Sequence, residues 1–227
     1  MASLTFNPDT HPESTSWDGA AARGVADESY STMRGGNGTY RQDSDATTVF
    51  NLSQDYDTED TYNDCGRAVY LFDTSELGAG ATVTAATFSI VVTIKTDTTP
   101  ADDYVALVDS DPASNTGRDH ADYQNMGATL QADNVLISNI NADSSTFNDW
   151  TLNAAGLASI ETEGITKFGM RVGIDLQNSD PGGWVLHAQK RSSITAASAE
   201  ETLSSDKRPK MVVTYTVSTF TPRAIMF

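Results

Sequence analysis

The sequence contains few of the residues from which covalent cross-links and metal centres are built. Cys65 is the single cysteine among 227 residues, which excludes an intrachain disulfide and a thiolate-bound metal cluster. The preceding residue, Asp64, is expected to raise the pKa of the thiol and to weaken it as a nucleophile. The three histidines, His11, His120 and His187, lack the spacing of metal ligands, so no histidine-built metal site is expected.

Basic residues and long apolar runs are also scarce. The chain has 14 Lys and Arg against 31 Asp and Glu, which gives a formal net charge of −17. This charge disfavours non-specific attraction to nucleic acid or to an anionic membrane, so neither is expected as a partner. Apolar runs reach only the length of a strand, which predicts no transmembrane helix. Residues 1–9 lack a basic segment followed by an apolar one, so no secretory signal peptide is expected.

Catalytic signatures are weak. No Gly-x-Ser-x-Gly elbow occurs, and the order of serines, histidines and aspartates suggests no triad. Carboxylates are abundant enough to include a glycosidase pair, but abundance without geometry defines no site. We therefore expect a non-enzymatic protein with no cofactor, calcium excepted.

What the sequence does contain is strong β patterning, clearest in residues 67–90. Tyr70 and Phe72 alternate with Val69 and Leu71, so the two pairs should point to opposite faces of a strand whose faces are both apolar. The polar residues 73–75 then end this strand, because short polar side chains bond locally to the backbone.

About ten short strands separated by Gly, Asp, Asn and Ser clusters predict an all-β fold, an antiparallel β-sandwich with one short helix. The helix is expected at residues 154–161, with Asn153 as its N-cap. Other strands are expected at residues 26–34, 47–52, 83–95, 104–108, 147–152, 167–174, 184–190 and 210–217. We divide the chain into an N-terminal arm (1–24), one sandwich domain (25–217) and a C-terminal tail (218–227).

Several blocks of sequence resemble a known family. Residues 67–90 read R-A-V-Y-L-F-D-T-S-E-L-G-A-G-A-T-V-T-A-A-T-F-S-I, residues 26–30 read A-D-E-S-Y, residues 183–190 read G-W-V-L-H-A-Q-K and residues 209–216 read P-K-M-V-V-T-Y-T. Together they resemble the DNRLRE/carbohydrate-binding-module-like family of jelly-roll β-sandwiches over residues 24–217, with Gly78 where that family usually has proline. Residues 8–19 and 111–116 also resemble elements of jelly-roll proteins encoded among bacteriophage structural genes.

The resemblance implies a jelly-roll strand order and a function. The expected protein is a non-enzymatic virion structural protein of a bacteriophage, such as a capsid decoration, head fibre or tail fibre and adhesion subunit. It would be made in the host cytoplasm, would need no signal peptide because lysis releases it, and would bind other virion proteins as a homo-oligomer or in a capsid lattice. The alternative is a carbohydrate-binding module or lectin, and a weaker alternative is a polysaccharide-active enzyme.

The acidic loop 53–66 contains the candidate metal ligands. Asp55, Asp57 and Asp60 could supply oxygen ligands to calcium, although the loop lacks the glycine and final glutamate of an EF-hand. A solvated acidic loop is the simpler interpretation.

A candidate glycan platform lies in the same loop. Sugar binding needs an exposed aromatic ring beside polar side chains, and Tyr56 and Tyr62 are the loop tyrosines expected to be exposed. Trp150 and Trp184 lie in expected strands and are assigned to the core, where most aromatic residues bury area.

The C-terminal tail contains the candidate docking residues. Phe220, Ile225, Met226 and Phe227 are apolar, and Pro222 separates them from the last strand. Such a segment should be buried, either on its own sandwich or against another subunit.

Overall fold

The computed structural model describes residues 1–42, 47–99, 101–177, 180, 182, 185–201 and 207–217. Its strands are β1 (Ala2–Phe6), β2 (Asp18–Glu28), β3 (Tyr40–Gln42), β4 (Thr47–Gln54), β5 (Tyr62–Asp73), β6 (Ala81–Asp97), β7 (Tyr104–Ser110), β8 (Met126–Leu130), β9 (Val135–Leu136), β10 (Phe147–Thr151), β11 (Ile165–Val172), β12 (Arg191–Ala197) and β13 (Lys210–Val217). The helices are α1 (Tyr30–Gly35), α2 (Ala154–Ala158) and α3 (Gly173–Leu176), with 3-10 turns η1 (Ser75–Leu77), η2 (His120–Tyr123) and η3 (Ile137–Asn139). The predicted all-β antiparallel sandwich is confirmed.

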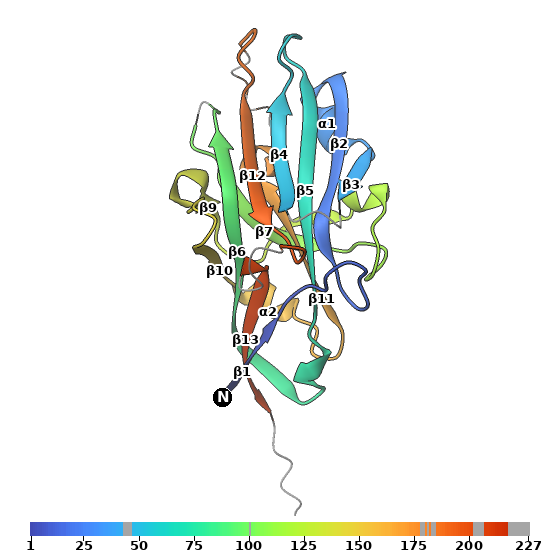
Figure 1. Ribbon diagram of the computed structural model, residues 1–227, viewed down its shortest axis with the longest axis vertical. Coiled ribbons are helices and arrows are strands. Elements are labelled where there is room, and N and C mark those ends of the chain that lie inside the picture. The colour runs from blue at the N-terminus through green and yellow to red at the C-terminus, as the bar shows by residue number, and fades with distance from the viewer. Residues whose placement is uncertain are drawn as a thin grey trace, which may run out of the picture.

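The long strand β6 joins the layers of the sandwich (Figure 1). Its first part pairs with β13, from Val217 opposite Ala81 to Lys210 opposite Ser89, and with β10. Its last part pairs with β12. From β12 the order of hydrogen-bonded strands continues through β4, β5, β11, β7 and β8. Because β6 pairs with β13 at one end and with β12 at the other, this single strand belongs to both layers.

The core lies between these layers, as the alternation in β5 predicts. Tyr70 and Phe72 are fully buried in the main cluster, where both rings contact Phe88 at centroid distances of 5.1 and 5.9 Å. Val69 and Leu71 point to the other side and form a second cluster with Trp17 and Met126. The predicted opposite orientation of these two pairs is confirmed.

Residues 1–24, expected as an N-terminal arm, pack onto the sandwich and contribute strands to it. β1 pairs with β13 over five residues, and β2 pairs with β5 across the expected domain boundary at residue 25. Ala20, Ala21 and Ala22 are buried in β2. Their small side chains give a weak β signal in the sequence, but in the structure they let β2 lie close to its neighbours.

The bounds of other expected elements also differ from those in the structure. The strand expected at residues 26–34 ends at Glu28, and Ser29 then caps α1 by accepting a hydrogen bond from the Thr32 backbone. The helix after Asn153 is confirmed as α2, with α1 and α3 in addition.

The strand expected at residues 184–190 is wrong for the described residues 185–190. His187 has a φ of 58°, which turns the chain in a way that an extended strand does not allow, and β12 begins only at Arg191.

Both ends of the described chain lie at one end of the molecule. Ala2 is opposite Tyr215 in the β1–β13 pair, and Val217 is opposite Ala81 at the start of β6. The other end of β6 points toward the opposite end of the molecule, where it pairs with β12 (Figure 1). No helix in the described part of the chain is long and apolar enough to cross a membrane.

Candidate functional site

A polar hollow lies on the outer face of the layer formed by β6, β12, β4 and β5. Its volume is about 410 Å³. Alternation along the strands explains its chemistry, because Phe50, Leu52 and Ile194 point into the core while the residues between them point outward. The hollow is lined by Val49, Asn51, Ser53, Asn63, Asp64, Ile94, Thr96, Gln189, Arg191, Ser193 and Thr195.

Asn51 and Asp64 form the most constrained part of this lining. The Asn51 side-chain amide donates to Asp64 Oδ2 at 2.7 Å and to Ser53 Oγ at 3.3 Å. Asn51 and Ser53 are each only 5% exposed although they lie on the outer face of the sheet. The hollow therefore has a preorganised polar floor rather than freely solvated side chains.

The carboxylate of Asp64 is the charged group of this floor. Partial burial raises its pKa, an effect that hydrogen bonds from Asn51 and Tyr40 oppose. The Tyr40 hydroxyl donates to Asp64 Oδ1 at 3.4 Å, and residue Tyr40 is 38% exposed. Tyr40 does not line the hollow itself, but its hydroxyl contacts the partly desolvated carboxylate that does.

Gly66 allows the floor to form. A Cβ at this position would lie 2.7 Å from Asn51 Oδ1 and 3.0 Å from the Val49 carbonyl oxygen, closer than side chains normally approach. The absence of a side chain at Gly66 therefore leaves room for the Asn51 side chain next to β5.

Side chains from β6, β12 and the segment before β12 form the rim. Arg191 Nη2 donates to Thr96 Oγ1 at 3.5 Å, and Gln189 Nε2 donates to Asn63 Oδ1 at 3.4 Å. The Arg191 backbone N–H donates to Thr98 Oγ1 at 2.9 Å. The rim thus offers guanidinium and amide donors above a floor of acceptors.

This arrangement suits a ligand with many hydroxyl groups. Hydroxyls both donate and accept hydrogen bonds, and the lining supplies a carboxylate, amides, hydroxyls and a guanidinium as partners. Hydrogen bonds to charged groups contribute about 1.5–3 kcal/mol each, so Asp64 and Arg191 are the strongest candidate contacts.

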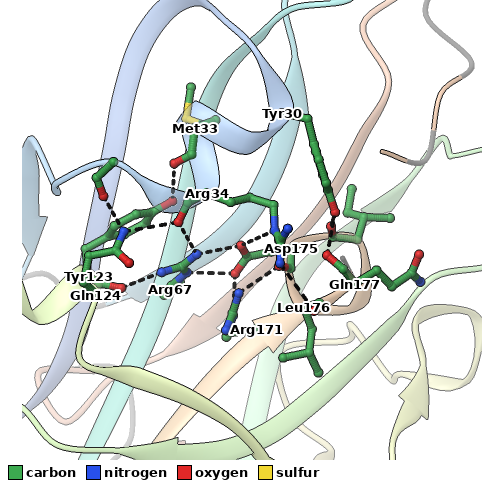
Figure 2. A network of polar contacts seen from close by, with 12 residues as sticks. Tyr30, Met33, Arg34, Arg67, Tyr123, Gln124, Arg171, Asp175, Leu176 and Gln177 are labelled. Atoms are coloured by element: carbon green, nitrogen blue, oxygen red, sulfur yellow. Dashed lines mark hydrogen bonds and ion pairs between the residues drawn. The ribbon is translucent and has the colours of Figure 1, made fainter. Parts of the chain in front are cut away.

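A buried charge network lies under the neighbouring part of β5 (Figure 2). Asp175 in α3 accepts from Arg67 Nη2 at 2.8 Å and from Arg171 Nε at 2.6 Å, and Arg34 Nε lies 3.6 Å from it. The guanidinium groups hold the pKa of the Asp175 carboxyl below its ordinary value in spite of complete burial. This network ties α1, β5, β11 and α3 together.

The remaining guanidinium donors of the network go to backbone carbonyl oxygens. Arg67 donates to the carbonyls of Tyr123 and Arg34, and Arg171 donates to those of Gly127 and Asp175. Three arginines against one aspartate are thereby accommodated inside the protein. The network is structural support for the strands of the hollow, and no part of it lines the hollow.

The free thiol belongs to the same interior region. Cys65 is fully buried, and burial, followed by the charge of Asp175, raises its pKa. The sequence predicts a raised thiol pKa because of the neighbouring Asp64. In the structure the main cause of the raised pKa is desolvation of the thiol.

The structure separates the two tyrosines of the predicted glycan platform. Tyr56 is 48% exposed, as expected, and its ring lies 5.2 Å from that of His187. Tyr62 is 1% exposed and begins β5, with its ring against Tyr30 and its hydroxyl donating to Asp180. The exposure predicted for Tyr62 is wrong, because the strand starts five residues earlier than the apolar run at residue 67 indicated.

The predicted calcium ligands are not brought together. Asp55 Oδ1 accepts from the backbone N–H groups of Asp57 and Thr58, which closes a local turn. Asp57 pairs with His187 at 3.0 Å, and Asp60 has a φ of 54°. Among the described residues, no group of three or more His, Cys, Asp and Glu side chains is arranged to hold a metal ion.

Two sets of predicted residues lie outside the described residues. They are Trp184 and the docking residues Phe220, Ile225, Met226 and Phe227. Trp150, assigned to the core, is buried against Phe88.

Sequence reasoning missed the hollow itself, although a signal was present. In β4 and β12 apolar residues alternate with Asn51, Ser53, Ser193 and Thr195, a period of two that marks one polar face. That pattern identifies the outward residues, but only the pairing of β4 with β12 and β5 brings them into one hollow.

Comparisons with known proteins add no further information to this geometry. A search against protein-family models found no matching family, and a search of curated proteins found no match.

Proposed function

We propose that the protein is a non-enzymatic adhesion subunit that binds carbohydrate in the polar hollow. The observation that carries this proposal is the preorganised floor of the hollow, in which the nearly buried Asn51 and Ser53 lie beside the partly buried Asp64. In this proposal the partly exposed Tyr40, whose hydroxyl contacts Asp64, supplies the aromatic surface on which a sugar ring would stack.

Binding rather than catalysis fits the chemistry of the lining. Hydrolysis of a glycosidic bond normally uses two carboxylates on either side of that bond. Among the described residues that line the hollow, Asp64 is the one carboxylate. A second groove, near β7 and β11, contains Asp109, Asp111 and Glu161, but Asp109 accepts from the Thr129 backbone and Asp111 pairs with Lys167.

The ligand expected from the charge of the chain is a neutral glycan. A net charge of −17 and a carboxylate in the floor disfavour acidic polysaccharides.

The position of the hollow suits a subunit attached at one end. The termini of the described chain lie at the Ala81 end of β6, whereas Ile94 and Thr96 of the hollow lie near its other end. At about 3.3 Å per residue, the strand separates Ala81 from Thr96 by roughly 50 Å. We propose that the attachment is to a bacteriophage particle, in keeping with the sequence resemblance, and that the jelly-roll order applies.

A glycan panel followed by calorimetry tests the proposal. The protein is expected to retain at least one neutral oligosaccharide and not hexagalacturonate, and to leave the bound sugar uncleaved. Asp64→Asn should weaken binding of that oligosaccharide at least about tenfold, because a charged acceptor is lost. Glu163→Gln, an exposed change in the turn before β11, should bind as the wild type does.

Three results would contradict the proposal. They are failure to bind any neutral glycan of the panel, undiminished binding by Asp64→Asn, and release of new reducing ends from the bound oligosaccharide.

A further inference from the structure

We propose that β1 is a self-pairing edge, through which two copies of the chain form a two-fold dimer. β1 is the first strand in the order of hydrogen-bonded strands and pairs along one edge, with β13. Within the described part of the chain no strand pairs with its other edge, which therefore offers backbone N–H and C=O groups to a further strand. This inference is independent of carbohydrate binding.

The edge of β1 lacks the features that usually prevent such pairing. Residues 2–6 contain no charge, proline or glycine, and their register with β13 is uninterrupted. Proteins normally protect an edge with charged residues, proline or a bulge. A flat, uncharged edge of five residues is therefore a template for another strand.

Of the other described strands that pair with a single neighbour, β3 and β9 are only three and two residues long, and β8 and β10 are protected by their contacts or charge. In β8 the pairing with β7 shifts register, and the backbone groups of Gly127, Thr129 and Leu130 are bonded to side chains of Arg171, Asp109 and Asn153. β10 contains the exposed residue Asp149. Among these described strands, β1 is therefore the one that lacks such protection.

The side chains of β1 match a second copy of the same strand. Leu4 and Phe6 face the core, whereas Ser3 and Thr5 face outward. Ser3 Oγ lies 3.0 Å from Thr214 Oγ1 on β13, a hydroxyl pair across neighbouring strands. An antiparallel pair of β1 strands centred on Leu4 would place Ser3 opposite Thr5 of the second copy on both sides, which repeats this hydroxyl pairing.

Charge favours a second copy at this place over other faces. Two chains of net charge −17 repel each other, and contact through a strip without acidic residues minimises the repulsion. Pairing of identical strands uses the open edge of both copies, so the assembly closes at two. A contact of five residues on each side is smaller than a standard interface of about 1,200–2,000 Å², so the dimer should be weak and depend on concentration.

Sedimentation equilibrium of the full chain, from low micromolar to millimolar concentration, tests the proposal. The average mass should rise toward twice that of one chain. Thr5→Lys should raise the dimer dissociation constant at least about tenfold, because it puts a lysine on the edge. The control, Thr82→Lys, makes the same change at an exposed position of β6 in the same layer and should dimerise as the wild type does.

Four outcomes would overturn the proposal. One is a wild-type chain that stays monomeric throughout, and another is a mass that rises beyond two copies. The third is equal dimerisation of Thr5→Lys and Thr82→Lys, with circular dichroism showing both to be folded. The fourth is loss of the dimer on deletion of residues 218–227 while Thr5→Lys retains it, which would place the interface in the tail.

Discussion

At the scale of single residues, Asp175 is the clearest case of a side chain whose role depends on its surroundings. It is fully buried, and its charge is compatible with that burial because Arg67 and Arg171 bond both oxygens while Arg34 lies nearby. Removal of one partner from a buried ion pair leaves uncompensated charge and typically costs about 3–5 kcal/mol. The sequence does not mark Asp175 among 31 acidic residues, since nothing local distinguishes it.

Asp175→Asn is therefore expected to lower the free energy of unfolding by about 3–5 kcal/mol at neutral pH, measured by urea denaturation. Asp111→Asn is the matched control, because Asp111 is 89% exposed and its pair with Lys167 should contribute less than about 1 kcal/mol. Equal effects of the two changes would show that the network adds little stability.

The same comparison has a defined pH dependence. The folded pKa of Asp175 lies below its ordinary value of 3.8, so its stabilisation is present above that pH and is lost as the pH falls through the folded pKa. The difference in unfolding free energy between wild type and Asp175→Asn should therefore shrink below about pH 3.8. The buried Asp18, whose pKa burial raises, acts in the opposite sense, but it is present in both proteins and cancels from the difference.

At the scale of elements, strands with a strong local pattern could be predicted and strands defined by tertiary contacts could not. β13 was predicted with its bounds, and the alternation of Tyr70 and Phe72 with Val69 and Leu71 gave the two faces of β5 correctly. β2 was missed because buried alanines carry no β-branched signal. Residues 185–190 have the composition of a strand, but His187 turns the chain, and its backbone N–H bonds to the Tyr56 carbonyl.

The candidate site could not be predicted from the sequence, because it also depends on tertiary contacts. Tyr62 and the three acidic loop residues were chosen for local composition, whereas the hollow depends on Asn51, Asp64 and Arg191, which meet only through strand pairing. The alternation of polar and apolar residues could have indicated the outward face. It could not have indicated which outward faces lie next to each other.

Substitution of Phe72 tests whether β5 lies at the centre of the core. Its ring is fully buried against Phe88, so Phe72→Ala should lower the free energy of unfolding by about 3–5 kcal/mol in chemical denaturation. Leu136→Ala, at a residue that is 43% exposed in β9, should cost much less. A loss below about 1 kcal/mol for Phe72→Ala would remove β5 from the centre of the core.

At the scale of the whole molecule, the proposed function gives the two ends of the sandwich different roles. The termini meet at one end and the polar hollow lies toward the other, with acidic residues distributed over a chain of net charge −17. Such a charge favours solubility and opposes non-specific association, so attachment requires specific uncharged surfaces. The apolar residues of the tail, which follow β13, remain the predicted attachment element.

Deletion of residues 218–227 tests this assignment. Because β13 ends at Val217 with its pairs to β6 complete, the truncated chain should melt within about 2 °C of the full chain in calorimetry, a change below about 0.5 kcal/mol. Attachment to the proposed particle should be abolished. A large loss of thermal stability would instead assign the tail to the sandwich core.

The continuity of β6 has a mechanical consequence. A pull applied between a ligand in the hollow and an anchor at the termini would act along this strand rather than across it. The bonds between antiparallel strands run perpendicular to the strand direction. The eight residue pairs between β6 and β13 would therefore share the load in shear, instead of opening one after another as in a zipper. A sandwich with this strand arrangement would maintain an adhesive contact under tension.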